Sequence, residues 1–229
     1  MSVHRLQGSP PIDVNVRRSA RARKLSLRVS RLDGKVTLTI PQRSPLREGI
    51  DFLESREIWL RTHLIRLAPE AVVHAGGVVP YRGDDLPVEV GSVKRTALRD
   101  GVLYVKDEAT AGLRAKAFLK LRARDVLAEA SDRYAAMVGR SYSRLSIRDT
   151  RSRWGSCSSE GVLMYSWRLI MAPPEVLDYV AAHEVAHLVE MNHSAAFWAV
   201  VERICPDYSV HRAWLRKNGD VLHRVNFGD

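Results

Sequence analysis

The residues whose types and spacing could do chemistry lie in one short segment of the chain. His183 and His187 are four positions apart, Glu184 follows the first histidine, and His193 comes six residues after the second. Positions i and i+4 lie on one face of a helix, so two imidazoles can bind one metal ion there. Three protein ligands with an open fourth position are typical of a catalytic zinc site. The segment predicts one Zn²⁺ per chain, held by His183, His187 and His193.

The identity of the third ligand needs its own argument. The spacing from His183 to His193 equals that of the metzincins, yet Glu190 stands where their turn glycine belongs. Every methionine lies at or before Met191, so no methionine turn can follow the site. A glutamate ligand on a later helix is the alternative, and Glu202 is the one glutamate after the motif. The sequence favours His193 and keeps Glu202 as the alternative.

Such a site predicts hydrolysis by an activated water. Zinc lowers the pKa of its bound water toward ~7 and polarises a carbonyl or phosphoryl oxygen. Glu184 would take the proton of that water as a general base and pass it to the leaving group. A cation or a phenol usually stabilises the oxyanion, and the sequence does not choose among its candidates. These candidates are Arg153, Arg168, Tyr208, His211 and Arg212.

A second unusual segment, residues 151–159, places two arginines beside a tryptophan in a loop rich in Gly and Ser. Arg153 and Trp154 could form a rim that binds an anionic group, or lie behind the zinc histidines. Trp154 could equally fill a gap in the core. Residues 164–169 have two interpretations as well: an edge strand that pairs with an extended substrate, or a buried strand with aromatic packing.

The elements around these segments predict an α+β fold. We expect an N-terminal β-rich region with one helix, over residues 1–107, followed over residues 108–229 by a mainly helical, minimal zincin-like domain with a short sheet. Expected strands cover 24–30, 35–40, 78–81, 86–90, 94–98, 102–105, 143–148 and 162–170. Expected helices cover 46–67, 110–139 with Gly139 as the residue that ends it, a segment after Pro173-Pro174 that carries the histidines, 195–205 with Ser194 as its cap, and 210–218 closed by Gly219. Asn192 can adopt the left-handed conformation that ends a helix.

The charge of the chain points to anionic partners. The net charge is +10 and the pI is about 10.0. A polyanion such as nucleic acid is one interpretation, and charge for solubility is the other. Seven basic residues and no acid lie between positions 17 and 31. They would decorate the exposed face of the hairpin expected at 24–40, which could contact nucleic acid or simply face solvent. The N-terminus lacks a signal-peptide pattern, no apolar run could span a membrane, and the two cysteines form no CxxC pair, so we expect a cytoplasmic protein without disulfides.

Several segments together resemble the YgjP-like metallopeptidase family. The resemblance rests on residues 17–29, 153–158, 166–169, 178–180, 183–188, 192–194 and 197–198. It implies a minimal zincin core, related to the SprT and WLM peptidases, behind a β-rich N-terminal extension. It also implies zinc ligands at His183, His187 and His193 and a general base at Glu184.

The substrate stays open at this point. A zinc-dependent metalloendopeptidase that cleaves a peptide or protein is the first hypothesis. A nucleoside triphosphate pyrophosphatase with a UTP-like substrate is the second, because the resemblance includes such an activity. The chain has no GxxxxGK[ST] loop and no evident acidic cluster for magnesium, which counts against it. The third is a nucleic-acid-associated, SprT-like protease that uses the basic hairpin.

Overall fold

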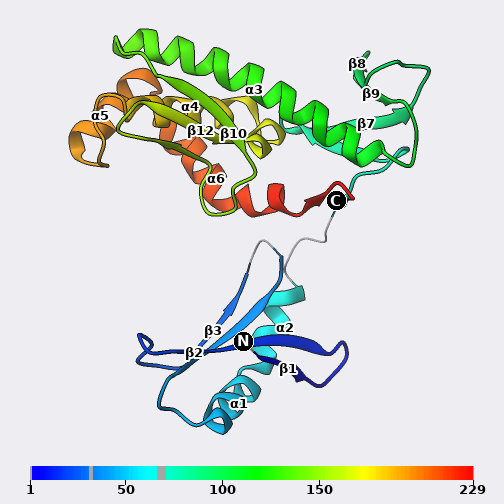
Figure 1. Ribbon diagram of the computed structural model, residues 1–229, viewed down its shortest axis with the longest axis vertical. Coiled ribbons are helices and arrows are strands. Elements are labelled where there is room, and N and C mark those ends of the chain that lie inside the picture. Colours follow the sequence, from blue (N-terminus) through cyan, green and yellow to red (C-terminus); the bar gives the residue numbers. More distant parts are fainter. Residues whose placement is uncertain (1, 31–32, 66–70, 229) are drawn as a thin grey trace. The chain divides into compact units, whose positions relative to one another are not determined.

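The computed structural model describes residues 2–30, 33–65 and 71–228. Its contacts divide the chain into two compact units, residues 1–69 and 70–229 (Figure 1). The predicted boundary near residue 107 falls inside the second unit. Strands on its N-terminal side share one hydrophobic core with the helix on its C-terminal side, through Val88, Leu103 and Val105 against Ala115 and Leu119. The division at 107 therefore stays a prediction from composition, whereas the contacts place the boundary between residues 69 and 70.

The first unit is a four-stranded sheet with two helices. Its elements are β1 (Ser2–Leu6), β2 (Ile12–Ser19), β3 (Ser26–Val29), β4 (Val36–Pro41), α1 (Leu46–Ser55) and α2 (Glu57–Ile65). The strand order is β1-β2-β4-β3, with β2 parallel to β4 and the other pairs antiparallel. The predicted hairpin of β3 and β4 is confirmed, whereas β1 and β2 were not predicted. The single helix expected over 46–67 is wrong, because the helical run is interrupted at Arg56.

Alternation along the strands decides which face of this sheet is covered. Residues of β2 and β4 that share one face are buried, whereas the residues between them are polar or charged. The buried set packs with α1 and α2: Ile12, Val14, Val16, Val36, Leu38, Ile40, Leu53 and Leu60. Gly49 lets α1 approach closely, since a Cβ at this position would collide with the Ile40 side chain. The other face of the sheet carries the polar set.

The second unit holds three small sheets and the remaining helices. One sheet has the order β6-β7-β9-β8, from Val78–Tyr81, Asp84–Val90, Val102–Val105 and Ala97–Arg99. Another has the order β10-β12-β11, from Arg144–Arg148, Val162–Ser166 and Gly155–Cys157, and β5 (Ala71–Val72) pairs with β13 (Val225–Asn226). The helices are α3 (Ala111–Val138), the 3₁₀ helix η1 (Trp167–Met171), α4 (Pro174–Ala186), α5 (Ala195–Ile204) and α6 (Tyr208–His223).

The predicted α+β class is confirmed, with particular differences in the second unit. The long helix α3 ends at Gly139 in the left-handed conformation (φ 63°), as its sequence predicts. The strand expected over 162–170 ends at Ser166, where the chain turns into η1. Gly219 does not close the last helix: it is buried inside α6, where a Cβ would lie 2.9 Å from the Trp154 ring.

The helix that carries the first two motif residues, α4, is held from several sides. It begins at Pro174, as predicted, and lies beside α3 (Figure 1). Arg133 and the Tyr134 hydroxyl on α3 both donate hydrogen bonds to the Asp178 carboxylate on α4. The turn between β6 and β7 contacts the start of α4, where Gly83 lies against Pro173. Among the described residues, no helix is both long and apolar enough to cross a membrane.

Candidate metal centre

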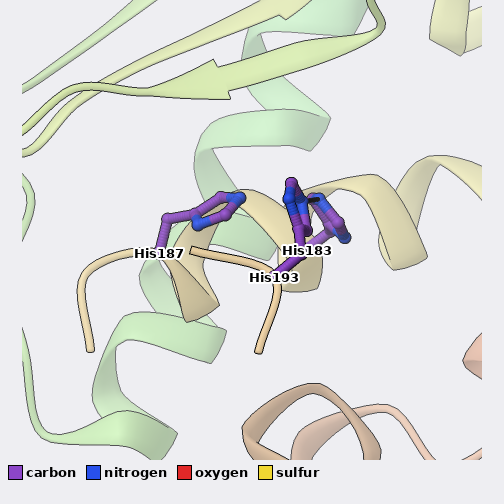
Figure 2. Close-up of side chains that lie close together, drawn as sticks. All are labelled: His183, His187 and His193. Atoms are coloured by element: carbon purple, nitrogen blue, oxygen red, sulfur yellow. Dashed lines mark hydrogen bonds between the residues drawn. The ribbon is translucent and has the colours of Figure 1, made fainter. Parts of the chain in front are cut away.

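Three histidines converge at the end of α4. His183 lies in its last turn, His187 is its C-cap, and His193 belongs to the loop that leads into α5. One nitrogen of each ring lies within 4.8 Å of the others, and the Nε2 atoms of His183 and His193 are 3.0 Å apart. Figure 2 shows the three rings directed toward one another. This arrangement brings together all three residues that the sequence predicted as metal ligands.

The protonation of these rings suits a metal ion. The Nδ1 atom of His187 lies 3.0 Å from the Glu190 carbonyl oxygen, which can only accept, so Nδ1 carries the proton and the lone pair of Nε2 is free. Burial lowers the pKa of His183 to about 3, helped by His187 and His193. Burial also lowers the pKa of His187. Neutral imidazole is the form that binds metals, so this donor set fits a zinc ion.

A compact turn returns the third histidine to the first two. After α4 the Leu188 amide donates to the Val185 carbonyl (2.9 Å) and the Glu190 amide to the Ala186 carbonyl (3.0 Å). The Ser194 side chain then caps α5 by accepting from the Phe197 amide (3.4 Å), as its position predicts. A left-handed Asn192 was expected to end the helix, and this is wrong. Among the described residues other than glycine, positive φ occurs at Arg82 and Asp100.

Aromatic side chains enclose the histidines on the α5 side. The Phe197 ring is fully buried, and its centroid lies 4.9, 4.4 and 4.8 Å from those of His183, His187 and His193. Trp198 stacks on His193 at 5.9 Å. The sequence marked Phe197 and Trp198 as part of the family resemblance and assigned them no contact with the histidines. Their adjacency to a capped turn after the motif was the one available signal that they would contact the histidines.

Glu184 lies beside this cluster and is largely buried. Its side chain is buried, and burial raises its pKa to about 8, while the positive charge of Arg153 opposes the shift. The strand β11 runs directly against the carboxyl group. A Cβ on Gly155 would lie 2.5 Å from Glu184 Oε1, so this position admits only glycine without displacing the carboxyl group. The sequence did not single out Gly155 for this contact.

A cleft of about 230 Å³ opens next to His183 and Glu184. Its walls also contain Arg153, Trp154, Gly155, Tyr179, Val180 and Leu215. The structure thus brings Arg153 and Trp154, both predicted from the sequence, to the rim of the candidate centre. Trp154 also packs inward, since its ring lies 4.7 Å from that of His223 and against Gly219. Trp154 therefore fills a gap in the core and also forms part of the cleft wall.

Two further candidates lie near the histidines, on α6. The Arg212 guanidinium sits 4.6 Å above the Trp198 ring. Burial raises the pKa of Tyr179 to about 12, and the charge of Arg212 opposes this rise; the same charge adds to the lowering of the His183 pKa that burial causes. Tyr208 stacks on Trp198 at 5.3 Å and on Tyr179 at 6.5 Å. Tyr179 was not predicted, although it precedes His183 by one helical turn on the same face.

The remaining two candidates have other surroundings. Arg168 forms a forked ion pair with Asp149 (2.7 and 3.3 Å) and donates to the carbonyl oxygens of Leu222 and Val225. These contacts hold the end of α6 and do not place Arg168 in the cleft. His211 lines a different cavity of about 410 Å³, together with Arg133 and Asp178. Glu202, the alternative ligand, is exposed on α5 and is not part of the three-histidine group.

In the sheet β10-β12-β11, the edge strand beside the cleft is β11. The strand β12 pairs with β10 on one side and β11 on the other, so residues 164–166 are central and buried. An edge strand over 164–169 is therefore wrong. The buried-strand interpretation is confirmed for 164–166 only, because residues 167–169 belong to η1. The edge of this sheet next to Glu184 is β11, because Gly155 contacts the Glu184 carboxyl group.

Comparison with known proteins agrees with this geometry. The sequence model of the YgjP-like metallopeptidase domain matches residues 23–218, which is most of the chain and includes the whole candidate centre. The chain belongs to the YgjP-like metallopeptidase family. The chain therefore carries a metallopeptidase-family domain that spans parts of both units, for which a metal ion and a peptide or protein substrate are the general expectation.

Two other comparisons complete this result. No curated protein matches the chain. Among solved structures, the crystal structure of the metallopeptidase zymogen of Pyrococcus abyssi abylysin is similar over 44% of this chain and 97% of that chain. The identity is 20% and the TM-score is 0.37, so this likeness carries no argument about the site.

Proposed function

We propose that this YgjP-like protein is a zinc-dependent metalloendopeptidase in which His183, His187 and His193 hold one zinc ion and Glu184 is the general base. The observation that carries the proposal is the convergence of three imidazoles within 4.8 Å, beside a buried carboxyl group. Membership in a metallopeptidase family supports a peptide or protein substrate and gives no support to a nucleotide.

The chemistry divides between the metal and the chain. A zinc ion in this site would lower the pKa of a water molecule toward ~7 and polarise the carbonyl of the scissile bond. A Glu184 oxygen takes a proton from the attacking water and gives it to the leaving amine nitrogen. A carboxyl group whose pKa is shifted toward neutrality suits both transfers. Arg153 keeps this pKa from rising further, because its charge favours the carboxylate.

The cleft suggests how the substrate lies. The free edge of β11 can pair with an extended peptide through backbone hydrogen bonds, which would place the scissile bond beside Glu184. Val180, Leu215 and Trp154 form apolar walls for a neighbouring side chain. Arg212 and Tyr208 are the candidates for stabilising the oxyanion, since both stack in the aromatic array beside His183.

Metal content tests the proposed ligand set. We expect elemental analysis of the purified protein to give one zinc per chain. His193→Ala should lose this zinc, whereas Glu202→Ala, the matched control on α5, should keep it. Zinc that survives in His193→Ala and disappears in Glu202→Ala would replace His193 by Glu202 as the third ligand.

Peptide hydrolysis tests the proposed activity. The zinc-loaded protein is incubated with a mixture of peptides of known sequence, and the products are identified by mass spectrometry. We expect cleavage within the peptides that a chelator stops and added zinc restores. A zinc-loaded, folded protein that cleaves no peptide but releases pyrophosphate from UTP would overturn the peptidase assignment and leave the metal site intact.

A further inference from the structure

Most of the net positive charge of this chain lies in the first unit. Residues 1–69 contain 14 Lys and Arg against six Asp and Glu, a net charge of +8, whereas residues 70–229 contain 22 against 20. The proposed peptidase site is made of residues of the second unit. The net charge of the first unit points to an anionic partner for that unit.

The topology of the sheet gathers the cations at one end. The strands β2 and β4 are parallel, with Ser19 opposite Pro41, so both chains leave the sheet at the same end. The segments that follow carry Arg21, Arg23 and Lys24 after β2, and Arg43 and Arg47 after β4. We call these five residues the basic end. All five are exposed, and among the described residues none of them forms an ion pair or a side-chain hydrogen bond.

Internal contacts hold the basic end in place. Arg18 at the end of β2 donates hydrogen bonds to the carbonyl oxygens of Gln42 (2.9 Å) and Ser44 (2.8 Å), and the Gln42 amide donates to the Ser19 carbonyl (3.2 Å). These bonds hold residues 42–44, and with them Arg43, against the end of β2, from which the segment with Arg21 continues. The exposed cations therefore flank backbone that Arg18 Nη1 holds in place.

The basic end continues onto the uncovered face of the sheet. Arg17 and Arg28 point away from the core, with Asn15 and Thr37 between them in the register. The acids of the strand region lie toward the other end, where Asp13 pairs with Arg5 (2.8 Å) and Asp33 contacts Lys35 (3.2 Å). The sheet is therefore electrically polarised along its strands.

The composition of this surface selects among anionic partners. Guanidinium groups bind phosphate oxygens in a forked geometry, and Asn and Thr add neutral hydrogen bonds to the same groups. A single strand would need aromatic side chains for base stacking. Both aromatic residues of the first unit, Phe52 and Trp59, lie on α1 and α2. A protein partner would need an apolar core to the interface, and the basic end offers only Leu46 beside it.

We propose that the basic end and the adjoining sheet face bind the phosphate backbone of a nucleic-acid duplex, independently of base sequence. The partner is recognised by its regular rows of phosphates, because the surface offers cations and hydrogen-bond donors and no stacking platform. This inference concerns the first unit and does not depend on the peptidase proposal.

Fluorescence anisotropy with the full-length protein and a short labelled DNA duplex of mixed sequence tests this inference. The test variant carries Arg21→Gln, Arg23→Gln, Arg43→Gln and Arg47→Gln. The control carries Lys94→Gln, Arg95→Gln, Arg216→Gln and Lys217→Gln, four exposed cations of the second unit, so that both proteins lose the same charge. Binding is measured from about 50 to 200 mM salt, where each phosphate contact contributes ~0.9 to the slope of log K against log salt.

We expect the test variant to bind at least about tenfold more weakly, with a slope shallower by about 3–4, and the control to stay within about twofold of the wild type. Each pair alone, Arg21 with Arg23 or Arg43 with Arg47, should give about half of the slope change, so that one misfolded variant does not decide the result. Equal losses in test and control, tighter binding of the single strand than of the duplex, or binding only to anionic lipid vesicles would each overturn the inference.

Discussion

The two units of this chain use polar residues in opposite ways. In the first unit, arginines stand exposed at one end of a sheet. In the second, His183 and Glu184 are withdrawn from water, and burial moves the pKa of the first down to about 3 and that of the second up to about 8. The difference teaches that attraction of a partner requires only exposed charge, whereas bond cleavage requires groups whose protonation is set by burial.

Aromatic residues follow the same division. The first unit has two, Phe52 and Trp59, while all the tyrosines and most of the tryptophans belong to the second unit. Several of them form the enclosure of the histidines, with Phe197, Trp198 and Tyr179 in ring contact with His183. These rings help to bury His183 and His187, and burial lowers the pKa of both, so that they stay in the neutral form that binds metals.

The largest expected effect comes from removing the proposed base. Glu184→Gln should lower the rate of peptide hydrolysis by about 10²–10⁴-fold, because the amide cannot accept the proton, while zinc content stays at the wild-type value. Activity is measured under single-turnover conditions alongside Glu175→Gln, an exposed glutamate in the first turn of the same helix. The base assignment fails if the two variants hydrolyse peptide at similar rates.

A smaller effect should follow from crowding the same carboxyl group. In Gly155→Ala the new methyl group would lie 2.5 Å from Glu184 Oε1, and a displacement of the carboxyl group by about 1 Å can cost ~100-fold in rate. Gly161→Ala, on the turn that follows the same strand, serves as the control, since its Cβ would meet only ordinary contacts near Leu188. Its positive φ (71°) makes that control a test of backbone strain without a clash at Glu184.

We expect zinc to remain bound in Gly155→Ala while the rate falls. A rate unchanged by this substitution would show that the approach of β11 to Glu184 has no part in the chemistry.

A matched pair of glycines compares the packing of the two units. A Cβ on Gly112 of α3 would collide with the Phe227 carbonyl oxygen and lie 2.8 Å from the Val73 carbonyl oxygen, and main chain cannot easily give way. A Cβ on Gly49 of α1 meets the flexible end of Ile40, and alanine gains helix propensity there. We expect Gly112→Ala to cost about 2 kcal/mol and Gly49→Ala less than about 1.

Urea unfolding followed by circular dichroism measures both glycine variants. Two separate unfolding transitions, each with a midpoint that only one of the two substitutions shifts, would show that the units unfold independently. A single transition that both substitutions shift equally would contradict the division into two units.

The smallest expected effect is a pH dependence that arises at His223. Burial lowers the pKa of this ring to about 4, with Arg168 as the next cause. Between the unfolded pKa near 6.5 and the folded value, the unfolded chain binds a proton that the folded chain does not, so stability falls as pH falls through this window. The loss from pH 7.5 to 5 should be about 1 kcal/mol, because part of the ring stays exposed.

The substitution His223→Phe isolates this effect. It keeps an aromatic ring against Trp154 and removes the titration, so the wild type should lose about 1 kcal/mol of unfolding free energy relative to the variant between pH 7.5 and 5. A difference that stays constant from pH 7.5 to 5 would contradict the assignment of the pH dependence to His223.

Much of the second unit follows from local rules. The helix start at Pro174, the cap at Ser194 and the left-handed Gly139 are determined by residues within one turn, and each was predicted. The interruption at Arg56 was missed, and so were β1 and β2, although residues 12–17 alternate apolar and polar as a half-buried strand does. Gly219 was misassigned for a different reason: its role is a close approach to Trp154, which no local pattern records.

The sequence by itself determined the chemistry on offer: three imidazoles and a carboxyl group at helical spacing, a basic N-terminal region and membership in a metallopeptidase family. Only the tertiary structure decided which other residues join them. It took Arg168 into an ion pair with Asp149, turned His211 toward another cavity, and placed Gly155 against Glu184. The physical reason is that periodicity fixes neighbours within a helix or a strand, whereas contacts between elements depend on how their buried faces pack.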